Sequence, residues 1–533
     1  MKVRYFCLSL TVLAASILMT GCQDLNEDPR ADLTPGTYYN TPQELEGGIA
    51  SMYRMLAPDD AWGFIVWQTS YFGSDDLSTV PGSNKELMRD FDRLQGDAGN
   101  GNVGLNQWNA PWKCIYQANN VLSVVDKVAF NSEEQKNGAA GQAHFMRGMC
   151  YFFLVRTFGE LPIVTDEVDI AERPDRQPIS DVYELIINDL TQAEALLPET
   201  WSGQPGKANR LAAKALLADV YLTLTGWPMN QSNYYALAAE KANDVIQSGK
   251  YTLVPEYGDV FKTNNNSECI FAFQYNTAGG LPRRSTGQFA VPQDETSAAG
   301  EEGWHDFCTE VNFYRNAPKC KRTDETFHTV LKIRDTETGV FSLVQWDDME
   351  KTRTQHPYFK KFRHGVAEPG TTAGDGVNET ETEIIKMAPS TDKTLDLIRY
   401  PYVLLNYAEA SAMASGGPTA AGYDAINLVR RRAGLPDLTP GLSQADFRDS
   451  VVYERAYECA GENGIRWFDI VRLQLLPQVL QQRVVGTWRE DQYWENPLNP
   501  NYTSGAGLQS RYLAPIPQSE MERNPEWKQN TGY

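Results

Sequence analysis

Residues suited to catalysis and metal binding are scarce in this sequence. Its 533 residues include only five histidines, and these are scattered: His144, His305, His328, His356 and His364. The zinc-protease pattern HExxH, the nucleophile elbow GxSxG and a phosphate-binding Walker loop are all absent from the sequence. These absences argue against metalloprotease, serine hydrolase and nucleotide-hydrolysing activity. The sequence implies no cofactor and no catalytic residue.

Cysteine is sparse and lacks metal-binding spacing. Eight cysteines are present and no two form a CxxC pair; beyond Cys7 and Cys22, the only near pair is Cys308 with Cys320. This dispersion excludes a disulfide scaffold and a zinc knuckle. Most of the later cysteines are therefore expected to be small buried hydrophobes. The disulfide state of the near pair and any bound metal stay open.

Positive charge is in deficit. Lysine and arginine number 48 against 69 aspartate and glutamate residues, a formal net charge of −21. Nucleic-acid binding and electrostatic adhesion to anionic lipid both require a basic surface, so this balance argues against them. No apolar run after the N-terminal segment approaches the length of a membrane span. If the protein is attached to a membrane, a covalently bound lipid has to provide the attachment.

The N-terminal segment has the layout of a secretory signal. Lys2 and Arg4 precede an apolar stretch of residues 5–19, which is shorter than the roughly 20 residues of a spanning helix. The small residues before Cys22 resemble the lipobox of bacterial lipoproteins, in which the cysteine carries the lipid. We expect residues 1–21 to be the signal and residues 22–40 the anchor and tether. The alternative is an ordinary cleaved signal that contains a cysteine.

Helix signals dominate the rest of the chain. Thr41 and Glu44 form a capping box at the start of one amphipathic segment, and Ser132 with Gln135 form another. A further helix is expected to start at Ser180. The sequence therefore predicts a mainly α fold.

Two helix pairs repeat the same pattern. Residues 210–226 with 234–249 form one pair, and residues 400–417 with 422–434 form the other. Alanines recur at helical spacing in both, which lets helices approach closely. Pairs of this length resemble tetratricopeptide units in shape, although the strict repeat signature is absent. Such units stack and commonly present a binding face.

Two stretches lack this periodicity. Residues 255–395 break into short apolar runs amid Gly, Thr and Asn, and residues 57–110 form a smaller irregular region. A long irregular stretch inside an ordered protein is more often a functional elaboration than a connector. We therefore expect the ligand side of the molecule here, carrying short strands.

The segment ERAYECAGENGIRWFDIVRL concentrates charge near the C-terminus. Glu454, Glu458, Arg466 and Asp469 are expected to form buried ion pairs that fix helix packing, rather than a catalytic group. Other motifs precede this charged segment. In order along the chain they are YYNTPQELEGGIASMY, WKCIYQANNVL, GQAHFMRGMCYFFLVRTFGELPIV, RLAAKALLADVYL, RYPYVLLNYAEA and AINLVRRRAGLP. After the charged segment, the chain closes with PIP…QNTGY. This order resembles the SusD/RagB family of surface lipoproteins. One departure is residues 460–464, where members commonly read closer to Phe-Glu-Gly-His-Arg.

The resemblance implies an architecture and a role. Residues 41–533 would form a single SusD-like domain, with a helical scaffold at about 41–254 and 396–533 and the ligand-side elaboration at about 255–395. The protein would bind a glycan at the cell surface, anchored in the outer membrane through Cys22 and facing the exterior. It would deliver that glycan to a SusC-like TonB-dependent transporter. Capture of peptides or another nutrient, a lid without ligand affinity, and an exported glycoside hydrolase are the alternatives.

The sequence gives little support for an enzymatic function. GNGNVG at residues 99–104 matches a dinucleotide-binding pattern, but no strand precedes it, so we expect a flexible loop there. Asp75 with Asp76 and Asp347 with Asp348 are carboxylate pairs of the type a glycosidase uses. Sequence neighbours point apart, however, so these pairs are poor catalytic candidates.

Aromatic side chains are the best candidates for ligand contact. Sugars stack on exposed rings while Asp and Arg bind their hydroxyls. Phe145, Phe152 and Tyr183 lie on helical faces and are expected in the core. The candidates fall in the two irregular regions, with Trp304, Tyr314 and Trp67 the strongest. The whole set is Trp304, Tyr314, Trp67, Tyr71, Asp75, Arg89, Trp346 and Arg315.

Overall fold

The structure is a computed structural model of the chain. It describes residues 38–64, 68, 70–79, 86–99, 101–165, 174–284, 306–335, 337–338, 340–348, 350–352, 355–363, 391–483 and 505–533. The predicted signal, Cys22 and most of the tether lie outside these residues, as do Trp67 and Trp304.

The first half of the described chain is helical. Its caps follow the sequence signals: Thr41 and Glu44 form a capping box, and Ser132 accepts a hydrogen bond from the Gln135 amide. Both predicted helix starts are thus confirmed, whereas the next helix begins one residue before Ser180. The helices are α3 (Pro42–Leu56), α4 (Glu86–Asp92), α5 (Gly101–Val124), α6 (Glu133–Phe158), α7 (Ile179–Leu196), α8 (Arg210–Leu224) and α9 (Tyr234–Gln247).

The expected loop at residues 99–104 is wrong in part. Helix α5 begins at Gly101, so four of the six residues form its first turn. Helix α4 and a short turn precede it, not a strand. The context that a dinucleotide site needs is therefore absent at this point.

Helices return after the central region. Helices α15 and α16 form the second predicted pair, and α15 packs on α9 of the first pair. Gly434 caps α16 in the left-handed conformation, as its position after the last helical residue predicts. These helices are α15 (Tyr400–Ala414), α16 (Ala420–Ala433), α17 (Gln444–Glu458), α18 (Ile465–Arg472), α19 (Leu476–Gln482), α20 (Gly505–Gln509) and α21 (Gln518–Arg523).

The central region consists of short elements, as predicted. Among the described residues, the two-stranded antiparallel sheets β3–β8, β4–β7 and β5–β6 are formed here, and a further one, β1–β2, lies in the first half of the chain. The helical elements are α10 (Tyr257–Val260), α13 (Val311–Arg315), α14 (Lys321–Thr326) and η3 (Lys360–Phe362). The strands are β1 (Leu161–Pro162), β2 (Arg176–Gln177), β3 (Cys269–Phe273), β4 (Phe327–His328), β5 (Val330–Arg334), β6 (Phe341–Gln345), β7 (Tyr358–Phe359) and β8 (Leu395–Arg399).

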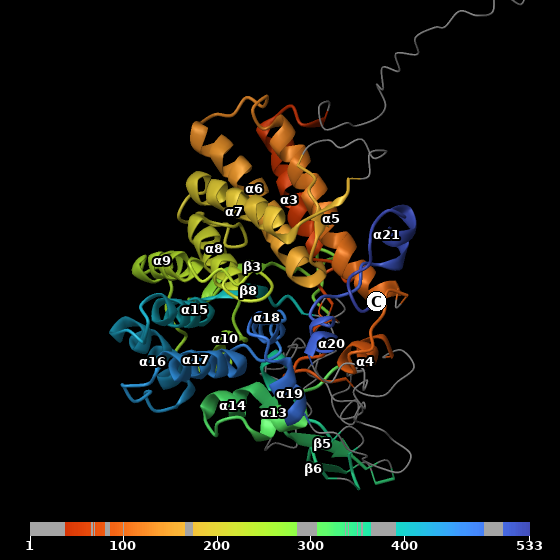
Figure 1. Cartoon of the computed structure of the whole chain (residues 1–533), viewed down its shortest axis with the longest axis vertical. Helices are drawn as coiled ribbons and strands as arrows, with labels where there is room; N and C mark the ends of the chain where they lie inside the picture. Colours follow the sequence, from red (N-terminus) through yellow and green to blue (C-terminus); the bar gives the residue numbers. More distant parts are fainter. Residues whose placement is uncertain are drawn as a thin grey trace, which may run out of the picture.

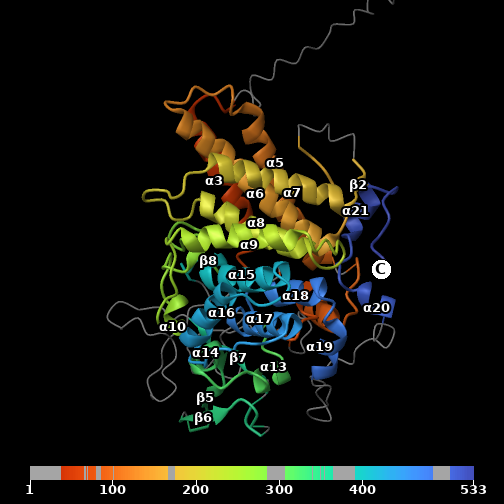
Figure 2. The same ribbon diagram turned by 60° about the vertical axis from the view of Figure 1, so that its left-hand side comes forward.

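The helices stack along the long axis of the molecule. Helices α3, α5, α6 and α7 lie at one end, α15, α16 and α17 follow, and the β5–β6 hairpin lies at the other end (Figures 1 and 2). Phe145, Phe152 and Tyr183 are buried in the main core, as their helical positions predict. Among the residues that the structure describes, no helix combines the length and apolar character needed to cross a bilayer.

The two irregular regions of the sequence meet in space. Ser78 and Cys308 form a β-bridge with both backbone hydrogen bonds at 2.8 Å. The Thr79 hydroxyl donates to the Asp306 carbonyl at 2.6 Å. Phe72 and Phe307 pack edge to face in a second hydrophobic cluster. The early region therefore supports the central elaboration.

Buried ion pairs join this elaboration to the helical scaffold. Glu458 on α17 lies 2.6 Å from Arg432 on α16, 3.2 Å from Arg399 at the end of β8 and 3.3 Å from Arg322 on α14. All four side chains are at most 3% exposed. Glu268, Glu454, Glu462 and Lys361 complete the cluster. Asp469, with Arg455, Arg472 and Glu409, forms a neighbouring one. The predicted structural role of this charged block is confirmed.

The cluster gives stability a defined pH dependence. Burial raises the pKa of Glu458, but the positive charges of Arg432, Arg399 and Arg322 outweigh it and lower the pKa from 4.5 to about 2. Because the folded pKa lies below the unfolded one, this stabilisation is present above pH 4.5 and is lost as the pH falls toward 2. The free energy of unfolding should therefore fall more between about pH 5 and pH 3 in the native protein than in Glu458→Gln. Urea unfolding at both pH values measures this, and equal falls would contradict it.

The loop before α18 depends on a glycine. Gly464 has a φ of +67°, and a Cβ there would clash with the Tyr71 ring. Gly416 has a φ of +75° with open space around it, which makes it a matched control. We expect Gly464→Ala to lower the free energy of unfolding by about 2–4 kcal/mol and Gly416→Ala by about 1 kcal/mol. Urea denaturation of the two variants measures the difference. Equal losses would mean that the contact with Tyr71 is easily relieved.

Candidate functional site

Helix α13 lies at the centre of the candidate site. Glu310 precedes it, and its carboxylate accepts a hydrogen bond from the Phe313 amide at 2.8 Å. The Phe313 ring stacks on Tyr457 of α17, with centroids 4.5 Å apart and an interplanar angle of 22°. The Tyr457 hydroxyl donates to the Phe313 carbonyl at 3.0 Å. These contacts hold α13 against α17.

A groove runs between α13 and helices α17, α18 and α19. Its volume is about 410 Å³, within the range of roughly 300–1,000 Å³ typical of small-ligand sites. Polar and apolar side chains both line it. They are Asp75, Glu310, Phe313, Asn316, Arg448, Asp449, Val452, Tyr453, Ala456, Tyr457, Arg466, Leu473, Leu475, Gln478 and Gln482.

Tyr453 presents the exposed aromatic surface of this groove. Its side chain is 43% exposed, whereas Tyr457 and Phe313 beneath it are each 5% exposed. Tyr453 packs edge to face on Tyr457 at 4.8 Å, and its hydroxyl donates to the Asn316 carbonyl at 2.9 Å. The ring is therefore fixed in place while it remains open to solvent. A fixed, exposed ring of this kind suits stacking on a sugar face.

Asp75 lies at the inner end of the groove. The Arg466 guanidinium donates two hydrogen bonds to the Asp75 carboxylate, at 2.6 and 2.7 Å. Burial lowers the pKa of Arg466, but the charge and hydrogen bonds of Asp75 outweigh it and raise that pKa above its ordinary value. This bidentate pair ties the early irregular region to α18. Asp75 is thus at the site with its carboxylate already engaged.

Polar side chains line the outer part of the groove. Gln478 and Gln482 are exposed on α19, and Arg448 and Asp449 lie on α17 with a salt bridge of 2.7 Å. The Asn312 amide donates to the Gln482 carbonyl at 2.7 Å, which joins α13 to α19. These amides and the Arg448 guanidinium are the kinds of groups that bind sugar hydroxyls.

Three of the predicted residues meet on the other side of α13. Tyr314 and Trp346 pack edge to face with centroids 5.7 Å apart, and the Arg315 guanidinium lies 5.8 Å from the Trp346 ring. Burial raises the pKa of Tyr314. Trp346 is 6% exposed, so Tyr314 and the exposed Arg315 provide the accessible surface. The structure brings these residues together next to the groove.

Other predicted residues lie elsewhere or outside the description. Tyr71 is 1% exposed and packs on Phe468 in the main core. Arg89 on α4 is buried and pairs with Glu86 at 3.1 Å. These two side chains have packing partners and do not line the groove. Trp304 and Trp67 lie outside the described residues, so their contact with ligand stays a prediction.

Sequence reasoning missed the groove residues on helices. Tyr453, Gln478 and Gln482 were absent from the candidates because aromatics on helical faces were assigned to the core and the glutamines lie far along the chain. A usable signal exists for Tyr453. Asp449 lies one turn earlier on the same face of α17, so the face that carries Tyr453 is partly polar.

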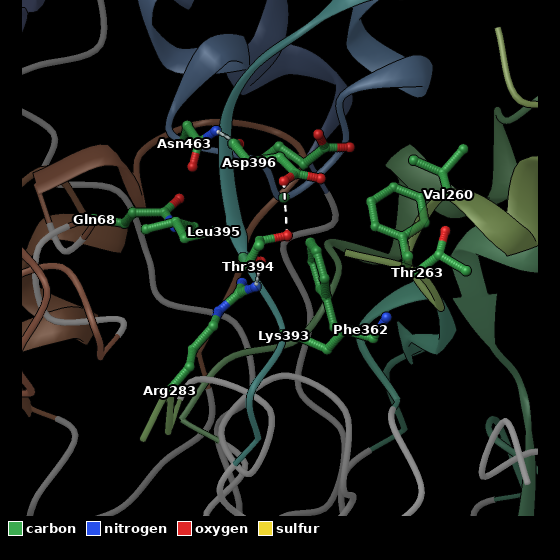
Figure 3. Close-up of a pocket in the computed structure, with 13 residues that line it drawn as sticks. Gln68, Val260, Thr263, Arg283, Phe362, Lys393, Thr394, Leu395, Asp396 and Asn463 are labelled. Atoms are coloured by element: carbon green, nitrogen blue, oxygen red, sulfur yellow. Dashed lines mark hydrogen bonds between the residues drawn. The ribbon is translucent and has the colours of Figure 1, made fainter. Parts of the chain in front are cut away.

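A second, smaller pocket lies beside β8 and is shown in Figure 3. Arg283 donates to the Thr394 carbonyl there, and the Thr394 hydroxyl donates to Asp396 at 2.9 Å. Burial lowers the pKa of Lys393 to about 8. The volume is only about 30 Å³, room for roughly two water molecules. A sugar ring does not fit, so we do not place the site here.

Three of the four carboxylates in the pairs considered for catalysis have structural partners, and the fourth, Asp347, is exposed. Asp76 accepts from the Ser74 hydroxyl at 2.6 Å and the Gly461 amide at 2.8 Å. Asp348 accepts from the amides of Glu350 and Lys351 in a turn. Within the described ranges no cluster of three or more His, Cys, Asp or Glu side chains could hold a metal ion.

Two family models match the sequence. The model described as "SusD family" matches residues 331–533, and the model described as "Starch-binding associating with outer membrane" matches residues 33–222. Among curated proteins, the chain is 28% identical to SusD-like protein P2 of Formosa agariphila, over 98% of this chain and 99% of that protein.

Solved structures share the fold. A SusD superfamily protein from Parabacteroides distasonis matches with a TM-score of 0.74 and 25% identity, over 94% of this chain and 100% of that one. Surface glycan-binding protein A from Bacteroides thetaiotaomicron, in complex with laminarihexaose, matches with a TM-score of 0.69 and 19% identity. That alignment covers 92% of this chain and 100% of the other. The predicted mainly helical, SusD-like architecture is confirmed.

Proposed function

Because this chain belongs to the SusD family, we propose that it binds an oligo- or polysaccharide in the α13 groove and passes it uncleaved to a transporter. The observation that carries the proposal is the fixed, exposed ring of Tyr453 within a groove of about 410 Å³ lined by amides and charges. A protein of the same fold, solved in complex with laminarihexaose, supports the ligand class. Tyr314 and Arg315 would extend the contact surface beyond the groove.

The engagement of the groove carboxylates supports a non-catalytic role. Asp75 accepts both hydrogen bonds of the Arg466 fork, and Glu310 holds the first turn of α13. Glycoside hydrolysis needs one carboxyl group free to donate a proton and a second facing the anomeric carbon. Residues already committed to positioning the helices are poorly suited to either task. We therefore place binding, without bond cleavage, at this site.

Delivery to the transporter follows from the proposed anchor. We propose that lipid on Cys22 holds the protein in the outer membrane, facing the exterior, above a SusC-like TonB-dependent barrel. The stacked helix pairs would supply the broad surface that contacts the barrel. A short tether keeps a captured glycan at high effective concentration over the transporter. The family model that associates starch binding with the outer membrane supports this location.

Replacing the anchor cysteine should release the protein. We expect Cys22→Ala to move most of the protein from the outer-membrane fraction to the soluble fraction, because the substitution removes the thiol that would carry the lipid anchor. Cys320→Ala, which changes a partly exposed cysteine elsewhere, should leave the protein in the membrane fraction. Immunoblots of fractionated cells measure both. Membrane retention of Cys22→Ala would contradict lipid anchoring at this residue.

The ligand class is tested by a binding screen. Residues 23–533 are run by affinity electrophoresis through gels that contain starch, laminarin, other polysaccharides or none, and are titrated with peptide digests in a calorimeter. Retardation by at least one polysaccharide supports the proposal. Binding of peptides alone would replace it with peptide capture by the same arrangement.

A further inference from the structure

A second large cavity lies on the helical scaffold, away from α13. It has a volume of about 560 Å³ and is lined by one face of α3, the loop before α8 and the end of β3. It shares no described lining residue with the α13 groove. Its size lies within the range of roughly 300–1,000 Å³ that small-molecule sites occupy. The glycan proposal makes no use of it.

The floor of this cavity is apolar and rigid. Ile49 and Phe273 are 2% and 1% exposed, and the Tyr53 ring packs edge to face on Phe273 at 6.2 Å. The Tyr53 hydroxyl accepts from the Ala208 amide at 3.0 Å and donates to Gln142. These hydrogen bonds fix the aromatic wall before any ligand arrives, which reduces the entropic cost of binding.

The mouth of the cavity carries one uncommitted positive charge. Lys207 pairs with Glu46 at 2.5 Å and lies 5.1 Å from the Trp201 ring. The Arg54 side chain, exposed on α3, makes no ion pair or hydrogen bond with any residue that the structure describes. Glu46 and Lys207 cancel, so Arg54 leaves the mouth with a net positive charge on a chain that is otherwise strongly acidic.

We propose that this cavity binds an amphiphilic carboxylate, with its apolar body against Ile49, Tyr53 and Phe273 and its carboxylate on Arg54. Burial of the apolar body supplies most of the affinity, and the guanidinium fork selects the carboxylate over a neutral head group. Both features are needed, because an apolar floor alone accepts any hydrocarbon.

The test compares two ligands that differ only in the head group. Decanoate, below its micelle concentration, and decanol are titrated into residues 23–533 in a calorimeter. Decanoate should bind about tenfold more tightly than decanol, the ratio expected from one charge-assisted contact. Arg54→Gln should remove that difference by weakening decanoate alone. Ala50→Trp, which places an indole at an exposed lining position, should weaken both ligands about tenfold or more.

Controls separate this site from the rest of the molecule. Lys113→Gln removes an exposed cation on α5 outside the cavity and should leave decanoate affinity unchanged. Glycan affinity should be unaffected by Arg54→Gln and Ala50→Trp, so a failure here is distinct from a failure of the glycan proposal. Absence of saturable decanoate binding overturns the inference. Equal affinity for decanoate and decanol in the native protein, or full affinity in Ala50→Trp, overturns it as well.

Discussion

Replacing Glu458 by Gln is expected to lower the free energy of unfolding by about 3–5 kcal/mol. Glu458 is fully buried and faces Arg322, Arg399 and Arg432, so removing its charge leaves three guanidinium groups short of a counter-charge. Those arginines come from α14, β8 and α16, and Glu458 itself from α17. The substitution therefore weakens the junction between the elaboration and the helical scaffold. Urea unfolding followed by tryptophan fluorescence measures the loss.

An exposed glutamate supplies the control for this variant. Glu240→Gln makes the same chemical change on the solvent face of α9 and should alter the free energy of unfolding by less than about 0.5 kcal/mol. If Glu458→Gln behaved like Glu240→Gln, the buried charge cluster would not be a major source of stability.

The second large effect is expected on binding. Tyr453→Ala should weaken the affinity for the glycan identified in the screen by at least about tenfold, because central aromatic contacts carry most of the energy of such sites. The Tyr453 ring is the open surface of the groove, and its neighbours Tyr457 and Phe313 remain buried below it. Calorimetric titration gives the change in dissociation constant.

Two variants distinguish stacking from other causes. Tyr453→Phe keeps the ring and loses only the hydrogen bond to the Asn316 carbonyl, so it should retain most of the affinity. Tyr116→Ala removes a 58% exposed ring from α5, outside the groove, and should bind like the native protein. Unchanged affinity of Tyr453→Ala would place the glycan elsewhere. An equal loss in Tyr116→Ala would show that the effect is not local.

Local signals in the sequence predicted much of the scaffold. The Thr41 capping box and the Ser132 cap depend on residues three positions apart, and the Gly434 cap depends on one backbone conformation. The two helix pairs followed from apolar and alanine spacing within each helix. The charged block of α17 and α18 was correctly interpreted as structural, because buried charges of opposite sign have to pair.

The site was harder to predict because it depends on contacts between distant residues. The Asp75–Arg466 pair spans 391 positions, and the Ser78–Cys308 bridge spans 230. No local sequence pattern indicates that α13 lies against Tyr453 and Tyr457. The start of α5 at Gly101 was missed for a different reason, because the alternating glycines and asparagines of residues 99–102 favour a loop on propensity alone. Tertiary packing overrides that preference here.

The most direct test of glycan capture without cleavage combines binding and product analysis. Residues 23–533 are titrated by calorimetry with the glycan that gives the strongest retardation in the screen. After the titration, the glycan is recovered from the calorimeter and its length is measured by chromatography. The account predicts saturable binding with the glycan recovered at its original length. Shortened products would contradict it by showing hydrolysis, and no binding to any glycan on the panel would contradict the proposed ligand class.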